Sequence, residues 1–132
     1  MVGDVEKLVR EAEWLIGVGK YDDAVAVLRS EDAPNDPRLC ALLARAYHTR
    51  GDTRGDVYSS HYFAVRALSL GSTDPHLRAI AGVAAFKKER YAEAIQHLLA
   101  AVTSTAGHAT HHLLGLACWH NGQAAEALPH LR

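Results

Sequence analysis

The chain has 132 residues, of which 48% are apolar and 22% are charged, and its net charge is −1 when the histidines are neutral. This length and composition are ordinary for one soluble globular domain. No apolar run approaches the roughly 18 residues of a membrane span, and the N-terminal sequence is too acidic for a secretory signal. We therefore expect a cytoplasmic protein with no membrane span.

The charges are unevenly distributed along the chain. Residues 1–36 carry nine acidic and four basic side chains, whereas residues 37–132 carry ten basic and six acidic ones and all nine histidines. This distribution favours pairing between molecules or an acidic partner, although solvated helix faces are the more common explanation. Cys40 and Cys118 lie within apolar helical patterns, which predicts buried, reduced thiols rather than a disulfide.

A nine-residue motif near the N-terminus recurs twice along the chain. KYDDAVAVL at residues 20–28 is followed by RYAEAIQHL at 90–98 and QAAEALPHL at 123–131. The first alanines of the three copies are Ala24, Ala94 and Ala127, which are 70 and 33 residues apart. A period of about 34 residues therefore predicts a missing copy near residue 57.

The missing copy is DVYSSHYFAVRAL at residues 56–68, where Ser60 takes the place of the alanine. The match requires a four-residue insertion, RGDV at residues 54–57, which predicts a lengthened or offset second helix in this repeat. We expect that deleting these four residues restores the regular period and leaves the protein folded.

Two of the predicted helices begin at Asp-Pro pairs. Asp36 and Asp74 can cap the free backbone amides, and Pro37 and Pro75 then occupy the first helical position. After each pair the apolar residues recur at helical spacing, so both segments are predicted to be amphipathic helices.

A small residue recurs at one offset in the first helix of each repeat. These residues, separated by 32, 38 and 33 positions, are Ala12, Ala44, Gly82 and Gly115. Each first helix ends at a tight turn, predicted at Gly19, Gly51, Glu89 and Gly122. Because the small residue and the alanine of the second helix are spaced to face one another, the two helices are expected to pack closely.

The pattern resembles the tetratricopeptide repeat family, a helix-turn-helix unit of about 34 residues. The residues that carry the resemblance are Ala12, Gly19, Tyr21, Ala24, Leu28, Ala44, Tyr47, Gly51, Ala67, Gly82, Tyr91, Ala94, Leu98, Ala101, Leu114, Gly115, Gly122, Ala127 and Leu131. The family's tryptophan near the start of each repeat is absent, since Trp14 and Trp119 fall at other offsets.

The resemblance implies an all-α fold, an α-solenoid of antiparallel helix pairs wound into a right-handed superhelix. One domain, residues 1–132, would hold about 3.5–4 repeats, at residues 4–35, 36–73, 74–106 and 107–132, the last one incomplete. The array then ends without a capping helix, which predicts either a fragment of a longer array or a homo-oligomer formed through the C-terminal repeat.

The sequence contains no assembled catalytic constellation, which predicts a protein that is not an enzyme and has no cofactor. His108 and His112 are one helical turn apart and could share a metal ion. A simpler explanation of the HATHH segment is that His108 lies at a helix start and His111 packs between helices. The basic residues are scattered, which argues against nucleic acid as a partner.

In arrays of the family that this chain resembles, the first helices line a concave groove that contacts a partner peptide or helix. The corresponding positions here are Glu6, Val9, Glu13, Arg38, Ala41, Arg45, His48, Thr49, His76, Ala79, Val83, Phe86, Lys87, Ala109, His112, Leu116, Trp119 and His120. The members expected to bind the partner are Glu13, Arg38, Arg45, His48, His76, Phe86, Lys87, His112, Leu116, Trp119 and His120.

The leading prediction is a non-enzymatic scaffold that binds a protein or peptide, acidic and with apolar anchors. A simpler alternative is that Phe86 and Trp119 are core residues and do not line the groove. Two other functions stay open, a self-assembling repeat element and the repeat region of a larger enzyme. The residues at which relatives grip a C-terminal carboxylate correspond here to Val9, Glu13, Leu42 and Ile80, which argues against that role.

Overall fold

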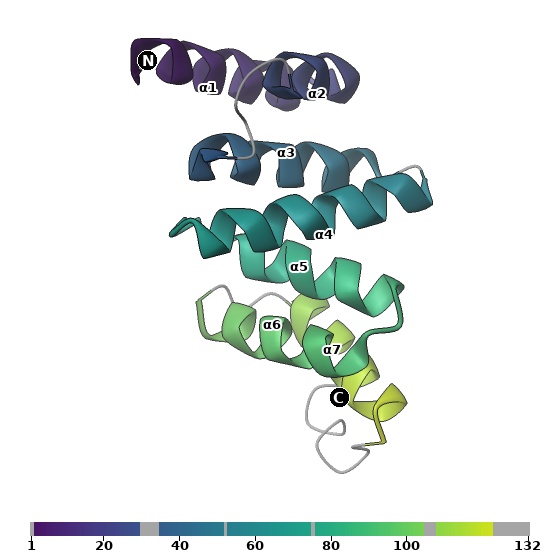
Figure 1. The fold of residues 1–132 in the computed structure, drawn as a ribbon. Coiled ribbons are helices and arrows are strands. Elements are labelled where there is room, and N and C mark those ends of the chain that lie inside the picture. The colour runs from purple at the N-terminus through teal and green to yellow at the C-terminus, as the bar shows by residue number, and fades with distance from the viewer. Residues whose placement is uncertain (1, 30–34, 52, 75, 105–107, 123–132) are drawn as a thin grey trace. The chain divides into compact units, whose positions relative to one another are not determined.

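The computed structural model describes residues 2–29, 35–51, 53–74, 76–104 and 108–122 (Figure 1). Its helices are α1 (Val2–Gly17), α2 (Tyr21–Arg29), α3 (Pro37–Arg50), α4 (Arg54–Ser69), α5 (His76–Lys87), α6 (Tyr91–Ser104) and α7 (His108–His120). No strand occurs among these residues. The all-α prediction is therefore confirmed.

The chain divides into two compact units, Met1–Leu77 and Arg78–Arg132. In the first unit, α1 packs against α2 and α3 packs against α4, each pair reversing direction at a short turn (Figure 1). In the second unit α6 packs against α7. The antiparallel helix pairs are as expected, whereas the repeat boundaries, the single domain and the superhelix stay predictions.

The cap predicted for α3 is present. Asp36 has extended backbone and its carboxylate accepts bonds from the backbone N–H groups of Arg38 at 2.8 Å and Leu39 at 3.3 Å. Asp74 accepts a bond from the backbone N–H of His76 at 2.9 Å. These short-range bonds satisfy amides that the helix itself leaves free, which is why both helix starts could be predicted from sequence.

The tight turns have left-handed backbone at the positions that the sequence indicates. Gly19, Gly51 and Gly122 have φ angles of 83°, 51° and 82°, and Glu89 has a φ of 62°. At the end of α5 the N–H of Glu89 donates to the carbonyl of Phe86, and that of Arg90 donates to the carbonyl of Ala85. This pair of hydrogen bonds ends a helix at a residue with left-handed backbone, and that residue is normally glycine. Glu89 has a side chain and is therefore strained at this position.

The first unit is held together by small and branched apolar residues. The small residues Ala12, Ala44 and Ala24 have no exposed surface, nor do Leu28 and Leu43. Ser60, the replacement for alanine in the second repeat, is also buried. Close packing of these positions leaves no room for larger side chains, which explains why the small residues recur at one offset.

A network of charges joins three helices of the first unit. Arg50, at the end of α3, donates from Nε to Asp56 of α4 at 3.1 Å and from Nη1 to Asp22 of α2 at 2.7 Å. The Asp56 side chain is 3% exposed, whereas that of Asp22 is 85% exposed. A guanidinium held between two carboxylates favours its charged form, so the pKa of Arg50 is raised, with the bond to Asp56 as the largest cause.

This network changes the interpretation of the RGDV insertion. Its four residues form the first turn of α4, which is 16 residues long. However, the insertion supplies Asp56, the buried partner of Arg50. Deletion of residues 54–57 would leave Arg50 without its main counter-charge, so the structure argues against the expectation that the deletion is harmless.

The second unit has its own core. One cluster of buried residues comes from α5, α6 and α7 and consists of Ala85, Ala94, Leu98, Leu114, Ala117 and Cys118. A Cβ atom added to Gly82 would lie 2.7 Å from both Cγ and Cδ2 of Leu98. The close approach expected at Gly82 is present, but it involves Leu98, one helical turn beyond Ala94, which was the predicted neighbour.

The two cysteines are free and buried, as predicted. Burial raises the pKa of the Cys40 thiol, and the positive charge of Arg66 offsets part of that effect. A buried thiol of raised pKa is a poor nucleophile, so Cys40 serves packing.

Candidate functional site

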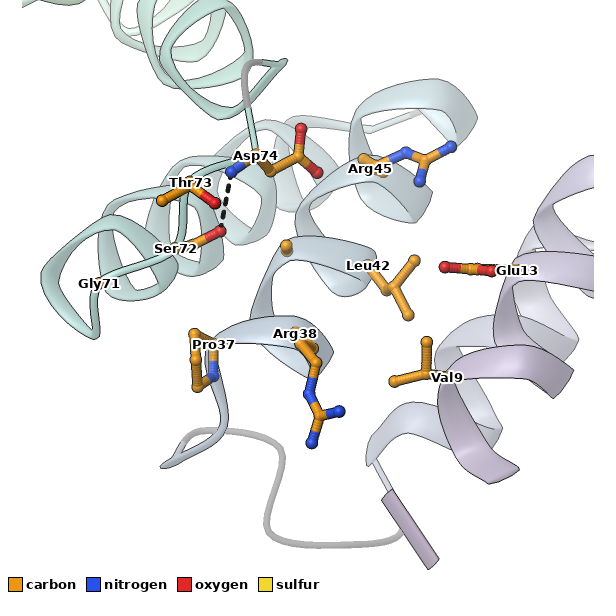
Figure 2. A pocket seen from close by; sticks show the side chains of 11 residues that line it. Val9, Glu13, Pro37, Arg38, Leu42, Arg45, Gly71, Ser72, Thr73 and Asp74 are labelled. Atoms are coloured by element: carbon orange, nitrogen blue, oxygen red, sulfur yellow. Dashed lines mark hydrogen bonds between the residues drawn. The ribbon is translucent and has the colours of Figure 1, made fainter. Parts of the chain in front are cut away.

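The first unit contains an open pocket between α1 and α3, of about 540 Å³ (Figure 2). Its wall on α1 is formed by Val9 and Glu13, and its wall on α3 includes Arg38, Leu42 and Arg45. The remaining lining residues are Pro37, Ala41, Gly71, Ser72, Thr73 and Asp74. The volume falls within the range of about 300–1,000 Å³ that is typical of ligand sites.

The pocket combines an apolar floor with charges of both signs. Ala41 and Leu42 are buried, and Figure 2 shows Val9 and Leu42 pointing toward one another from the two helices. Glu13 and Asp74 offset the charges of Arg38 and Arg45, so this pocket is not a purely cationic surface. An exclusively acidic ligand would therefore meet repulsion as well as attraction here.

The structure brings three of the predicted binding residues of the first unit into this pocket, namely Glu13, Arg38 and Arg45. Two others, His48 on α3 and His76 at the start of α5, are exposed but are not among its lining residues. Leu42 and the loop at residues 71–74 were not predicted for the groove. Leu42 has the spacing of a core residue, and no local sequence pattern places that loop beside α3.

The second unit has a cluster of aromatic rings where α5, α6 and α7 meet. The Tyr91 and His120 rings are stacked, with centroids 4.9 Å apart and an angle of 13° between their planes. Phe86 meets them edge-on, with its centroid 5.5 Å from Tyr91 and 5.9 Å from His120. Sequence analysis named Tyr91 as a residue that matches the repeat pattern and did not predict it as a binding residue.

Trp119 precedes His120 on α7, and 57% of it is exposed. It is therefore not a core residue, and the simpler alternative is wrong for Trp119. Phe86 is half-buried and packs partly against the core, so it takes part in both the core and the aromatic cluster. Farther along α7, His112 is exposed and Leu116 is half-buried.

The turn between α5 and α6 is rich in positive charge. Lys87 and Arg90 are exposed, and Arg90 makes a 3.9 Å contact with Glu93. Burial, and secondarily the charge of Arg90, lower the pKa of Lys88. The main cause is the partial removal of Lys88 from water, so the shift reflects burial more than neighbouring charge.

The metal alternative at His108 and His112 is untested. α7 begins at His108, whose side chain lies outside the described part of the chain. His111 is half-buried, in keeping with a packing role. The third copy of the repeated phrase, residues 123–131, also lies outside the described residues.

Solved structures of one protein, MamA, share this fold. A crystal structure of MamA has a TM-score of 0.76 and 18% identity, over 96% of this chain and 68% of that chain. A MamA MSR-1 structure has a TM-score of 0.77 and 21% identity, over 96% and 72% of the two chains. A MamA AMB-1 structure has a TM-score of 0.52 and 19% identity, over 95% and 91%.

The MamA fold is a tetratricopeptide-like helical repeat, so the likeness supports the helical repeat predicted from the sequence. No protein-family model matches the chain, and no curated protein matches its sequence. None of the helices in the described ranges combines the length and the apolar character needed to cross a membrane.

Proposed function

We propose that this chain is a degenerate tetratricopeptide repeat array that acts as a non-enzymatic interaction module. Its ligand is a segment of a partner protein that is acidic overall and carries apolar anchors. Glu13, Arg38 and Arg45 are the proposed partner contacts of the first unit, and Phe86, Lys87, Trp119 and His120 are those of the second. His48, His76, His112 and Leu116 remain proposed contacts on the same helices.

The observation that carries this proposal is the exposed position of Trp119. A tryptophan that is 57% exposed leaves a large apolar surface in water, and the next residue on α7, His120, stacks on Tyr91. Tryptophan and tyrosine are enriched among the residues that dominate binding energy at protein interfaces, whereas rim charges mainly set association rate and salt sensitivity. Trp119 is therefore the proposed anchor site, and the basic turn supplies the preference for acidic residues.

A matched pair of variants tests the proposal. Random decapeptides displayed on phage are selected against the intact chain, and the affinity of an enriched peptide is measured by fluorescence anisotropy. Trp119→Ala is expected to weaken binding about 30-fold, which corresponds to about 2 kcal/mol. Trp14→Ala is the control, because Trp14 is 61% exposed but lies outside the proposed contacts.

The proposal also predicts a pH dependence. Free histidine gains its positive charge as the pH falls through about 6.5, so an acidic peptide is expected to bind the parent chain more tightly at pH 6 than at pH 8. If Trp119→Ala and Arg45→Glu both fold and bind as the parent does at both pH values, the groove assignment fails.

Self-assembly through the C-terminal repeat is the alternative function. It involves residues 123–132, outside the described residues, and stays a prediction. Light scattering over a range of protein concentration tests it, since only self-assembly makes the molar mass rise with concentration.

A further inference from the structure

Two opposite charges in the pocket of the first unit have no partner among the residues that the structure describes. Within the described residues, neither the Arg45 guanidinium nor the Glu13 carboxylate takes part in an ion pair or a side-chain hydrogen bond. The other two charges of the pocket are engaged. Arg38 lies 3.6 Å from Asp36, and Asp74 accepts the bond from the His76 amide.

The surroundings of Arg45 suit a ligand more than solvent alone, whereas Glu13 is exposed. Arg45 is half-buried, so its guanidinium is only partly hydrated. Its planar group of N–H donors matches both oxygens of a carboxylate, and the match is stronger where water is partly excluded. Glu13 lies on the opposite wall, on α1, and accepts bonds only from a positively charged or neutral donor.

Two apolar side chains lie next to these charges. Val9 lies one helical turn before Glu13 on α1, and Leu42 lies one turn before Arg45 on α3. Both apolar side chains line the same pocket, and Leu42 is 4% exposed. A ligand that pairs with both charges and fills the pocket therefore places an apolar group over Val9 and Leu42.

From this arrangement we propose that the pocket binds a peptide segment that carries a carboxylate, a basic side chain and an apolar residue. The carboxylate pairs with Arg45, the lysine or arginine of the segment pairs with Glu13, and the apolar residue covers Val9 and Leu42.

This inference rests on the proposed function and refines it. The partner is acidic overall because of the basic turn in the second unit, but the segment that enters this pocket carries one positive charge. A peptide with acidic residues alone would place a carboxylate against Glu13, and such juxtapositions oppose binding. Glu13 thus acts as a specificity determinant against uniformly acidic segments.

Charge exchange tests the inference. Random decapeptides on phage are selected in parallel against the intact parent chain and the double variant Glu13→Lys/Arg45→Glu. Selection on the parent is expected to enrich peptides that combine an acidic, a basic and an apolar residue. Glu13→Lys alone and Arg45→Glu alone should each weaken binding of such a peptide by about tenfold or more. Arg45→Gln, which removes the positive charge without introducing a negative one, should also weaken binding.

The double variant provides the decisive comparison. It is expected to bind the peptide whose acidic and basic residues have been exchanged, with an affinity within about threefold of the parent's for the original peptide. The control is Glu11→Lys/Arg54→Glu, which makes the same charge changes at exposed residues that do not line the pocket. This control should retain binding of the original peptide.

The outcomes separate this inference from the proposed function. Enrichment of purely acidic peptides, or a double variant that still prefers the original peptide, overturns the mixed-charge assignment. If Trp119→Ala weakens binding of the enriched peptides in that case, the proposed function stands without the mixed-charge assignment. A folded parent chain that enriches no peptide overturns both.

Discussion

Replacing Arg50 by methionine is expected to destabilise the first unit strongly, because it leaves the Asp56 carboxylate buried without a counter-charge. Asp56 is 3% exposed and receives bonds from two nitrogens of Arg50. Removing one partner of a buried pair typically costs about 3–5 kcal/mol. The Arg50 side chain is 26% exposed, which lets water reach the site, and Asp56 lies in the favourable first turn of α4. We therefore expect a loss of about 2–4 kcal/mol.

The comparison with the second partner of Arg50 isolates the effect of burial. Asp22→Asn removes only the ion pair with Arg50, from a side chain that is 85% exposed. Exposed ion pairs contribute only about 0–1 kcal/mol to the free energy of unfolding. The double variant Arg50→Met/Asp56→Met removes both buried charges and should recover at least half of the stability lost in Arg50→Met.

Urea denaturation is the suitable assay, because guanidinium would screen the charges being measured. The fluorescence of Trp14 reports on the first unit when Trp119 is replaced by phenylalanine in every variant, which separates the two units if they unfold at different concentrations. Equal costs for Arg50→Met and Asp22→Asn, both below about 1 kcal/mol, would refute the argument from burial.

Three further substitutions test the packing. Glu89→Gly should stabilise the chain by about 0.5–1 kcal/mol, since glycine removes the left-handed strain. Glu89→Ala keeps the strain and should not stabilise the chain, so equal melting temperatures for the two variants would count against strain. Gly82→Ala should cost about 1–2 kcal/mol through its clash with Leu98, while Gly17→Ala, with open space around it, should not lower the melting temperature. Ala94→Asp should cost about 3 kcal/mol or more, and a loss no larger than that of an exposed alanine, Ala92→Asp, would contradict its buried position.

The helix starts and turns were predictable because their causes are local. The Asp36 cap and the left-handed position of Glu89 depend on hydrogen bonds between residues that lie within five positions of one another. The small residues at Ala12 and Gly82 are likewise visible as a period in the sequence, since every helix pair repeats the same close approach. These features determined the all-α repeat without any knowledge of long-range contacts.

The candidate site could be predicted only in part. The family resemblance placed Glu13, Arg38 and Arg45 in the groove, and the structure has them on the walls of the pocket. The same resemblance named Tyr91 only as a residue that matches the repeat pattern, although its ring stacks on His120. Nor does the period distinguish an exposed tryptophan from a buried one, so the position of Trp119 had two interpretations.

By itself, then, the sequence determined which segments are helices, where they turn and which faces are apolar, because these properties arise from interactions between near neighbours. Only the tertiary structure decided which charges are engaged. Arg50 and Asp22 are 28 residues apart in the chain and are joined by a hydrogen bond. Arg45 is a similar side chain on the same helix, but it has no side-chain partner among the described residues. The partners of a charge depend on which residues the packing of separate helices brings within a few ångströms, and no local pattern encodes that distance.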